Sequence, residues 1–189
     1  MRKTFRHVTT SDLVFYDTEM TGYNPYYDRI IEIAACKFDP NSNTFQSLVN
    51  PQGLKIPEKI KRLTGITDTD VIYAPPARTV LLDFVNYCGP NAVLVAHNND
   101  SADQRFLEEL AGATGVKLPP WLFIDTFRIA QKLFPTYGSG LKELCQKFNV
   151  EWGGHRALSD AISVRGIYKK MVKVTPEEAY RYFRRNELF

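Results

Sequence analysis

The stretch LVFYDTE, residues 13–19, decides the fold, because it combines an apolar β-forming run with two carboxylates. It predicts a buried strand that ends in acidic residues. Residues i and i+2 of a strand point to the same face, so Asp17 and Glu19 project together. Two adjacent carboxylates repel each other and are costly to desolvate, and a divalent cation is the usual remedy. A solvated strand end is the alternative that this stretch alone leaves open.

The surrounding sequence predicts the rest of the sheet. Two β-like runs, 29–38 and 45–49, follow residues 13–17 at short spacing, which is typical of an antiparallel meander. Further along, helix patterns alternate with strand patterns. Strands are expected at 92–96 and 122–124, and helices at 57–63, 77–88, 103–113, 125–134, 140–148, 157–172 and 176–186. This order predicts one α/β domain, a mixed five-stranded sheet with three antiparallel strands and then parallel strands, flanked by helices.

Composition excludes several classes of protein. The 189 residues are 44% hydrophobic and 24% charged with a net charge of +3, which is ordinary globular usage and argues against disordered or collagen-like chains. The three cysteines have no C-x-x-C spacing, so we expect buried thiols rather than disulfides or a zinc cluster. No run approaches the roughly 20 apolar residues that span a bilayer, so we expect a soluble, cytoplasmic protein without membrane contact.

A histidine and an acid lie close together near the C-terminal end of the chain, in HRALSD at 155–160. The preceding pair, Gly153 and Gly154, predicts that His155 lies on a flexible lead-in, while Asp160 projects from the first turns of a helix. This arrangement lets a mobile base approach a fixed metal ligand. A surface or capping histidine is the alternative reading of this motif by itself.

A third polar group follows the apolar strand 92–96. It comprises His97 and Asn98, with Asp100 and Asp103 shortly after them. Loops at the carboxyl ends of strands are where open α/β sheets place their sites. A helix N-cap at Asp100 or Ser101 is the alternative explanation.

Together these motifs resemble the DEDDh family of 3′→5′ exonucleases, the group that contains the proofreading subunit of bacterial replicative DNA polymerase. The matching segments are FYDTEMTG at 15–22, IIEIA at 30–34, LTGIT at 63–67, VAHN at 95–98, DQRFL at 103–107, IDTFRIAQKLFP at 124–135, SGLKELCQKF at 139–148 and HRALSD at 155–160. The resemblance implies a ribonuclease H-like fold, which agrees with the predicted meander. It gives an exonuclease domain at 11–175, an N-terminal extension at 1–10, and a basic C-terminal helix at 176–189 packed on the domain.

The resemblance also implies a catalytic site. Its metal ligands would be Asp17, Glu19, Asp103 and Asp160, holding two Mg²⁺ or Mn²⁺ ions, and carboxylates without thiolates suit such hard cations. His155 would be the general base. Asp103 stands one residue later than the family spacing allows, and alignment on the following Phe-Leu pair selects it. Asp100 is the competing candidate.

Substrate contacts follow from the same resemblance. Residues expected to line the pocket for the terminal nucleotide are Thr18, Met20, Thr21, Gly22, His97 and Asn98. The expected substrates are 3′ ends of single-stranded or frayed DNA or RNA, and a DNA polymerase or repair complex is the expected partner. Met20 is an oligoribonuclease-like feature, so an exoribonuclease acting on short RNA or RNA 3′ ends is an alternative. A catalytically silent binding module is another, although Asp17, Glu19, Asp160 and His155 are all present.

Overall fold

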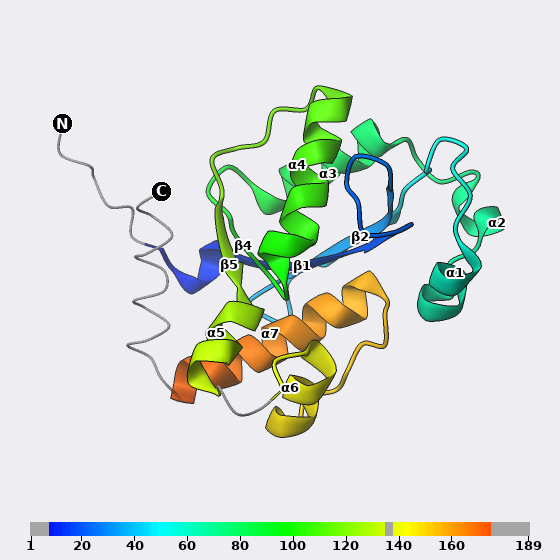
Figure 1. The fold of residues 1–189 in the computed structure, drawn as a ribbon. Helices are drawn as coiled ribbons and strands as arrows, with labels where there is room; N and C mark the ends of the chain where they lie inside the picture. Colours follow the sequence, from blue (N-terminus) through cyan, green and yellow to red (C-terminus); the bar gives the residue numbers. More distant parts are fainter. Residues whose placement is uncertain (1–7, 135–137, 175–189) are drawn as a thin grey trace.

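A five-stranded sheet forms the centre of the computed structural model, which describes residues 8–134 and 138–174 (Figure 1). The strands are β1 (Leu13–Met20), β2 (Ile30–Lys37), β3 (Phe45–Leu48), β4 (Val93–Ala96) and β5 (Leu122–Asp125), in the order β3-β2-β1-β4-β5. β2 pairs antiparallel with β1 and β3, whereas β4 pairs parallel with β1 and β5. The predicted mixed sheet is therefore confirmed. The predicted helix at 176–186 and most of the predicted N-terminal extension lie outside the described residues.

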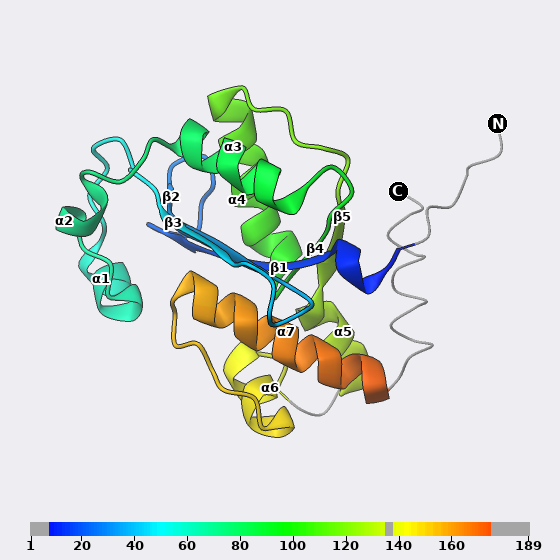
Figure 2. The same cartoon turned by 180° about the vertical axis from the view of Figure 1, so that it is seen from behind.

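Helices cover both faces of this sheet. Their bounds are α1 (Glu58–Thr64), α2 (Asp68–Val71), α3 (Ala77–Cys88), α4 (Asp103–Thr114), α5 (Thr126–Leu133), α6 (Leu141–Phe148) and α7 (Ala157–Val174), with 3₁₀ turns at Thr10–Asp12 and Asn99–Ser101. α3 and α4 lie on one face, and α5, α6 and α7 lie on the other (Figures 1 and 2). In the described chain, no helix has both the length and the apolarity needed to cross a membrane.

Two differences from the predicted helices have local causes. The helix predicted from residue 125 begins at Thr126, because Asp125 ends β5 and its carboxylate caps the helix by accepting the N–H of Phe127 at 2.9 Å. The short helix α2 was not predicted, because one turn shows no amphipathic period. It packs with α1 over Ile31 in a separate small core.

The alternation of β1 explains where its acidic end points. Val14 and Tyr16 belong to the core beneath α3 and α4, whereas Leu13 and Phe15 belong to the core beneath α5, α6 and α7. Side chains two residues apart share a face, so the 13, 15, 17 series continues on the α7 side and Thr18 falls on the α4 side. The three cysteines are free and buried, as predicted.

Candidate active site

Three carboxylates converge where β1 ends against the start of α7. Asp17 and Glu19 come from β1 and Asp160 from α7, and one oxygen from each lies within 4.8 Å of the others. Glu19 and Asp160 are only 8% and 4% exposed, and Asp17 is partly buried. Negative charge is thus concentrated at the carboxyl-terminal end of β1, the central strand, as the i, i+2 spacing predicts. The group formed by Asp17, Glu19 and Asp160 is called the acidic edge below.

This concentration of charge raises the pKa values of the carboxyl groups. Burial, followed by the charges of Asp160 and Glu32, raises the pKa of Glu19 to about 8. Burial and the charges of Asp103 and Glu19 hold the pKa of Asp17 well above its ordinary value. Burial also raises the pKa of Asp160, against hydrogen bonds that favour its charged form. A divalent cation bound among these carboxylates would offset their mutual repulsion.

The two oxygens of Asp160 have different environments. Oδ2 accepts the backbone N–H of His155 at 2.9 Å, whereas Oδ1 is buried and has no hydrogen-bond partner within residues 8–134 and 138–174. A buried carboxylate oxygen without a donor is costly. Asp160 is one of the three carboxylates in the group, and a donor set made only of oxygen atoms suits Mg²⁺ or Mn²⁺. The residues present therefore fit a hard divalent cation.

Asp103 adjoins this group from the opposite face of the sheet. It is the first residue of α4, is 3% exposed, and accepts both the N–H of Thr18 at 2.8 Å and its hydroxyl at 2.7 Å. Burial raises the pKa of Asp103 to about 6, and the bonds from Thr18 oppose the rise. Its oxygens fall outside the group of three that share the 4.8 Å limit, but its charge acts on Asp17.

Asp100, the competing candidate, points elsewhere. Its Oδ2 lies 2.5 Å from Nε of Arg128 on α5, and its side chain is 39% exposed. The structure thus brings Asp103, and not Asp100, to the acidic edge. Thr18, a predicted substrate contact, is buried and donates its hydroxyl to Asp103.

His155 lies in a turn that the backbone holds in place. Gly154 and His155 both have left-handed backbone, with φ of 71° and 65°. A side chain on Gly153 would collide with the backbone of Ser159 and Asp160, so this loop approaches α7 more closely than other residues allow. The His155 ring packs edge-on against Trp152 with centroids 5.3 Å apart. The lead-in predicted to be flexible therefore makes two contacts, the hydrogen bond from the His155 N–H to Asp160 and the ring contact with Trp152.

The segment after β1 forms a compact turn built around Asp28. The Asp28 carboxylate accepts the hydroxyl of Thr21 at 3.1 Å and the N–H of Asn24 at 2.9 Å, and it fills the space where Gly22 would carry a Cβ. Met20 precedes this turn and is partly buried, with its sulfur 3.3 Å from the Thr18 hydroxyl. Met20, Thr21 and Gly22 thus lie directly beyond the acidic end of β1.

His97 and Asn98, two other predicted substrate contacts, bond to the neighbouring strand and helix. Nδ1 of His97 lies 3.0 Å from the Thr126 hydroxyl, and its ring packs on Phe127 of α5. Burial lowers the pKa of His97 to about 4. Asn98 is exposed in a left-handed conformation, and its N–H binds Asp125. These contacts connect neither residue to the acidic edge.

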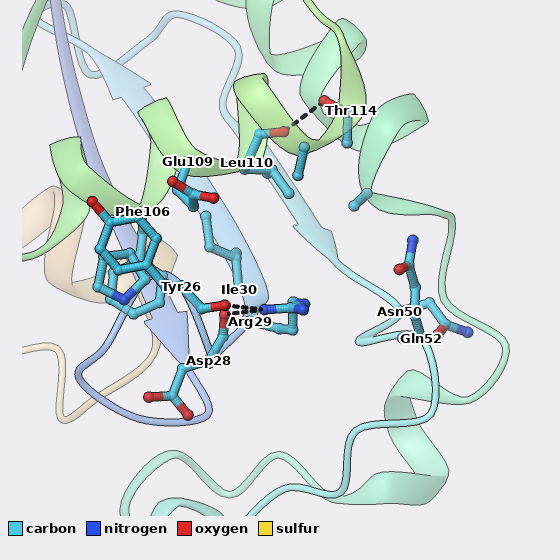
Figure 3. A pocket seen from close by; sticks show the side chains of 13 residues that line it. Tyr26, Asp28, Arg29, Ile30, Asn50, Gln52, Phe106, Glu109, Leu110 and Thr114 are labelled. Atoms are coloured by element: carbon cyan, nitrogen blue, oxygen red, sulfur yellow. Dashed lines mark hydrogen bonds between the residues drawn. The ribbon is translucent and has the colours of Figure 1, made fainter.

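A separate cavity of about 140 Å³ lies between the turn after β1 and α4 (Figure 3). Tyr26, Asp28, Arg29, Phe106 and Glu109 are among the residues that line it. No member of the three-carboxylate group lines it, so this cavity is distinct from the acidic edge.

Comparison with known proteins connects this geometry to a family. The family model described as "Exonuclease" matches residues 14–180. The chain belongs to this exonuclease family. The predicted resemblance is confirmed at the level of the family, and so is the enzyme class, that of nucleases.

Two curated relatives of this chain carry DNA polymerase III names. The chain is 32% identical over 173 residues to "DNA polymerase III subunit epsilon" of Aquifex aeolicus, covering 89% of this chain and 83% of that protein. It is 34% identical over 177 residues to "DNA polymerase III PolC-type" of Bacillus subtilis, covering 89% of this chain and 12% of that protein. The chain therefore spans about an eighth of the length of the PolC-type relatives it matches.

Solved structures share the fold. Exonuclease X in complex with 5′ overhanging duplex DNA superposes with a TM-score of 0.69 at 24% identity, covering 87% of this chain and 93% of that one. The zinc-bound complex of E. coli exonuclease I with single-stranded DNA gives 0.79 at 16% identity, covering 92% of this chain and 43% of that one. The predicted ribonuclease H-like architecture is confirmed by this likeness.

Two residues near the site were not singled out by sequence reasoning. Glu32 is fully buried on β2 opposite Glu19, and Arg156 binds it. The available signal was a lone carboxylate inside the otherwise apolar run IIEIA, which predicts a buried charge that needs a partner.

Proposed function

We propose that this chain is a metal-dependent 3′→5′ exonuclease that hydrolyses phosphodiester bonds at the 3′ ends of single-stranded or frayed DNA. The observation that carries the proposal is the unpartnered Asp160 Oδ1, buried in a carboxylate group with Asp17 and Glu19 and tied to the loop of His155. Membership of the exonuclease family supports phosphodiester hydrolysis as the reaction.

In this proposal, Asp17, Glu19, Asp103 and Asp160 hold two Mg²⁺ or Mn²⁺ ions. Bound divalent cations supply Lewis acidity and neutralise charge on the phosphate. The four carboxylates would fix the positions of these cations, and the negative phosphate would be held by the cations rather than by the carboxylates. This assignment is supported by the raised pKa values, because groups that resist ionisation in the metal-free protein gain most from a cation.

His155 is the proposed general base. An imidazole side chain can act as a general base and accept a proton from the attacking water. The water oxygen forms a bond to phosphorus, the bond from phosphorus to the 3′ oxygen of the preceding nucleotide breaks, and the water proton passes to the imidazole. The departing 3′ oxygen takes a proton from solvent, and the imidazolium returns its proton to solvent. The products are a nucleoside 5′-monophosphate and a strand that is one nucleotide shorter with a 3′ hydroxyl.

DNA is the proposed substrate because the relatives named above are DNA polymerases or polymerase subunits. Met20, Thr21 and Gly22 are the proposed contacts to the terminal nucleotide, since they follow Glu19 directly and their turn is preorganised by Asp28. A DNA polymerase is the proposed partner on the same grounds. Co-elution of the purified chain with the replicative polymerase of its own organism in gel filtration tests this part, and separate elution contradicts it.

The activity is tested with single strands of DNA and RNA labelled at the 5′ or the 3′ end. The proposal predicts mononucleotide release from the 3′ end of DNA in Mg²⁺ and none in chelator. Faster digestion of short RNA would favour the exoribonuclease alternative. Binding of DNA without cleavage in Mg²⁺ or in Mn²⁺ would favour a catalytically silent binding module.

A further inference from the structure

Glu32 is a buried acid next to the proposed site that no step above uses. It lies on β2 directly opposite Glu19 in the antiparallel pair, and it is fully buried. A buried carboxylate beside other carboxylates is strongly unfavourable unless hydrogen bonds and a positive charge compensate it. The contacts of Glu32 therefore show how its buried charge is stabilised and which segments it holds.

Four donors satisfy both oxygens of Glu32. Oε1 accepts Nη2 of Arg156 and Nε2 of Gln46, both at 2.8 Å. Oε2 accepts Nε of Arg156 at 3.2 Å and the backbone N–H of Ala157 at 3.1 Å. The arginine contact is a two-point guanidinium–carboxylate pair, which fixes orientation as well as distance. Burial alone would raise the pKa of Glu32, but these donors outweigh it and hold the pKa below its ordinary value.

This use of both oxygens distinguishes Glu32 from the proposed metal ligands. Asp160 keeps a buried oxygen without a donor, whereas each oxygen of Glu32 has two donors. Glu32 is also outside the group of three carboxylates within 4.8 Å of one another. Two of its partners, Arg156 and Ala157, lie 124 and 125 positions away along the chain, so Glu32 connects β2 to the start of α7.

The residues that Glu32 holds directly follow His155. Arg156 and Ala157 lead from the left-handed turn at His155 into α7, and the negative charge of Glu32 lies at the N-terminal end of this 18-residue helix, where it is favourable. On its other side, the N–H of His155 is held by Asp160. The turn is thus fixed at three consecutive residues, 155, 156 and 157.

We propose that Glu32 is a positioning residue for His155: by holding the guanidinium of Arg156 and the N–H of Ala157, it fixes the turn that directs the imidazole toward the attacking water. The inference rests on the proposed role of His155 as base. A displacement of a catalytic group by about 1 Å can cost about 10²-fold in rate. Loss of the Glu32 carboxylate should therefore lower kcat and leave substrate binding unchanged.

The test compares Glu32→Gln with a matched control, Asp68→Asn. Glutamine keeps the shape of Glu32 but presents an amide N–H₂ to donors. The Asp68 carboxylate likewise pairs with a charged group, Nζ of Lys61 at 2.8 Å, and accepts a hydrogen bond from the backbone N–H of Ile56 at 2.8 Å. Asp68 lies on α2, away from the acidic edge. The expected result is a fall in kcat of about 10²-fold for Glu32→Gln with KM and the Mg²⁺ requirement unchanged. The control should keep wild-type kcat.

A double-mutant cycle separates positioning from a general loss of structure. If Glu32 acts through His155, then adding Glu32→Gln to His155→Ala lowers kcat no further than His155→Ala alone. Multiplicative losses, or a rise in KM with kcat unchanged, would overturn the inference. Arg156→Met gives a second variant in case Glu32→Gln does not fold, because the Arg156 side chain is 46% exposed; Arg156→Lys should restore part of its activity.

The same cycle distinguishes failure of this inference from failure of the proposed function. Wild-type turnover in His155→Ala alone would remove the proposed base, and the positioning role with it. An inactive His155→Ala combined with a fully active Glu32→Gln would leave the base in place and reject only the positioning role.

Discussion

Replacing Glu19 with glutamine should stabilise the metal-free protein at alkaline pH, although it removes a proposed metal ligand. Burial and the neighbouring carboxylates raise the pKa of Glu19 from its ordinary value of 4.5 to about 8. The folded state therefore holds this proton more tightly than the unfolded state, so the free energy of unfolding falls as pH rises from about 4.5 to about 8. Below this window the group is protonated in both states, and above it the full penalty is present.

The size of this penalty follows from the pKa difference. One pKa unit corresponds to about 1.4 kcal/mol, so the rise from 4.5 to about 8 means that Glu19 alone destabilises the metal-free protein at pH 8.5 by on the order of 5 kcal/mol. Glutamine is neutral at every pH and removes this penalty. In EDTA, Glu19→Gln should thus equal or exceed the wild type in stability at pH 8.5, and its advantage should shrink toward pH 4.5.

Urea unfolding followed by tryptophan fluorescence measures this difference at several pH values, and subtracting the two proteins cancels most other titrating groups. Adding Mg²⁺ at pH 8.5 should stabilise the wild type and have a much smaller effect on Glu19→Gln. A stability difference between the two proteins that is independent of pH, or a glutamine variant less stable than the wild type at pH 8.5, would refute the reasoning.

Three further predictions concern activity. His155→Ala should lose at least about 10²-fold in kcat with little change in Mg²⁺ affinity by calorimetry; a wild-type pH–rate profile in this variant would remove His155 as the base. Asp103→Asn should strongly reduce hydrolysis while Asp100→Asn should not, and activity assays giving the opposite order would move the fourth acid to Asp100. Met20→Ala should raise KM on short oligonucleotides with little effect on kcat, whereas an unchanged KM would make Met20 a packing residue only.

Local periodicity predicted most of the fold. The geometry of a strand at residues 13–19 predicted that Asp17 and Glu19 share a face, since a period of two needs no tertiary information. Asp103 was selected by the family resemblance, through alignment on Phe106 and Leu107, and all three residues are buried in α4. Asp100 falls in the preceding 3₁₀ turn.

Contacts between distant segments were not predictable in the same way. The pairing of Glu32 with Arg156 joins residues 124 positions apart, and a local sequence pattern does not show which distant residues come into contact. The glycine pair before His155 predicted freedom, but the structure uses the glycines for close approach to α7 and for a left-handed turn. His97 stands in a family motif, yet its ring orientation depends on Thr126 and Phe127, which only the fold brings near.

The central claim is that the acidic edge holds divalent cations for hydrolysis at 3′ ends. Its most direct test is a time course of digestion of 5′-labelled single-stranded DNA by the wild type and Asp17→Asn, in Mg²⁺, Mn²⁺ or EDTA. The account predicts a ladder shortened from the 3′ end by the wild type in either cation, and no cleavage by Asp17→Asn or in EDTA. Cleavage that persists in EDTA, or a fully active Asp17→Asn, would contradict it.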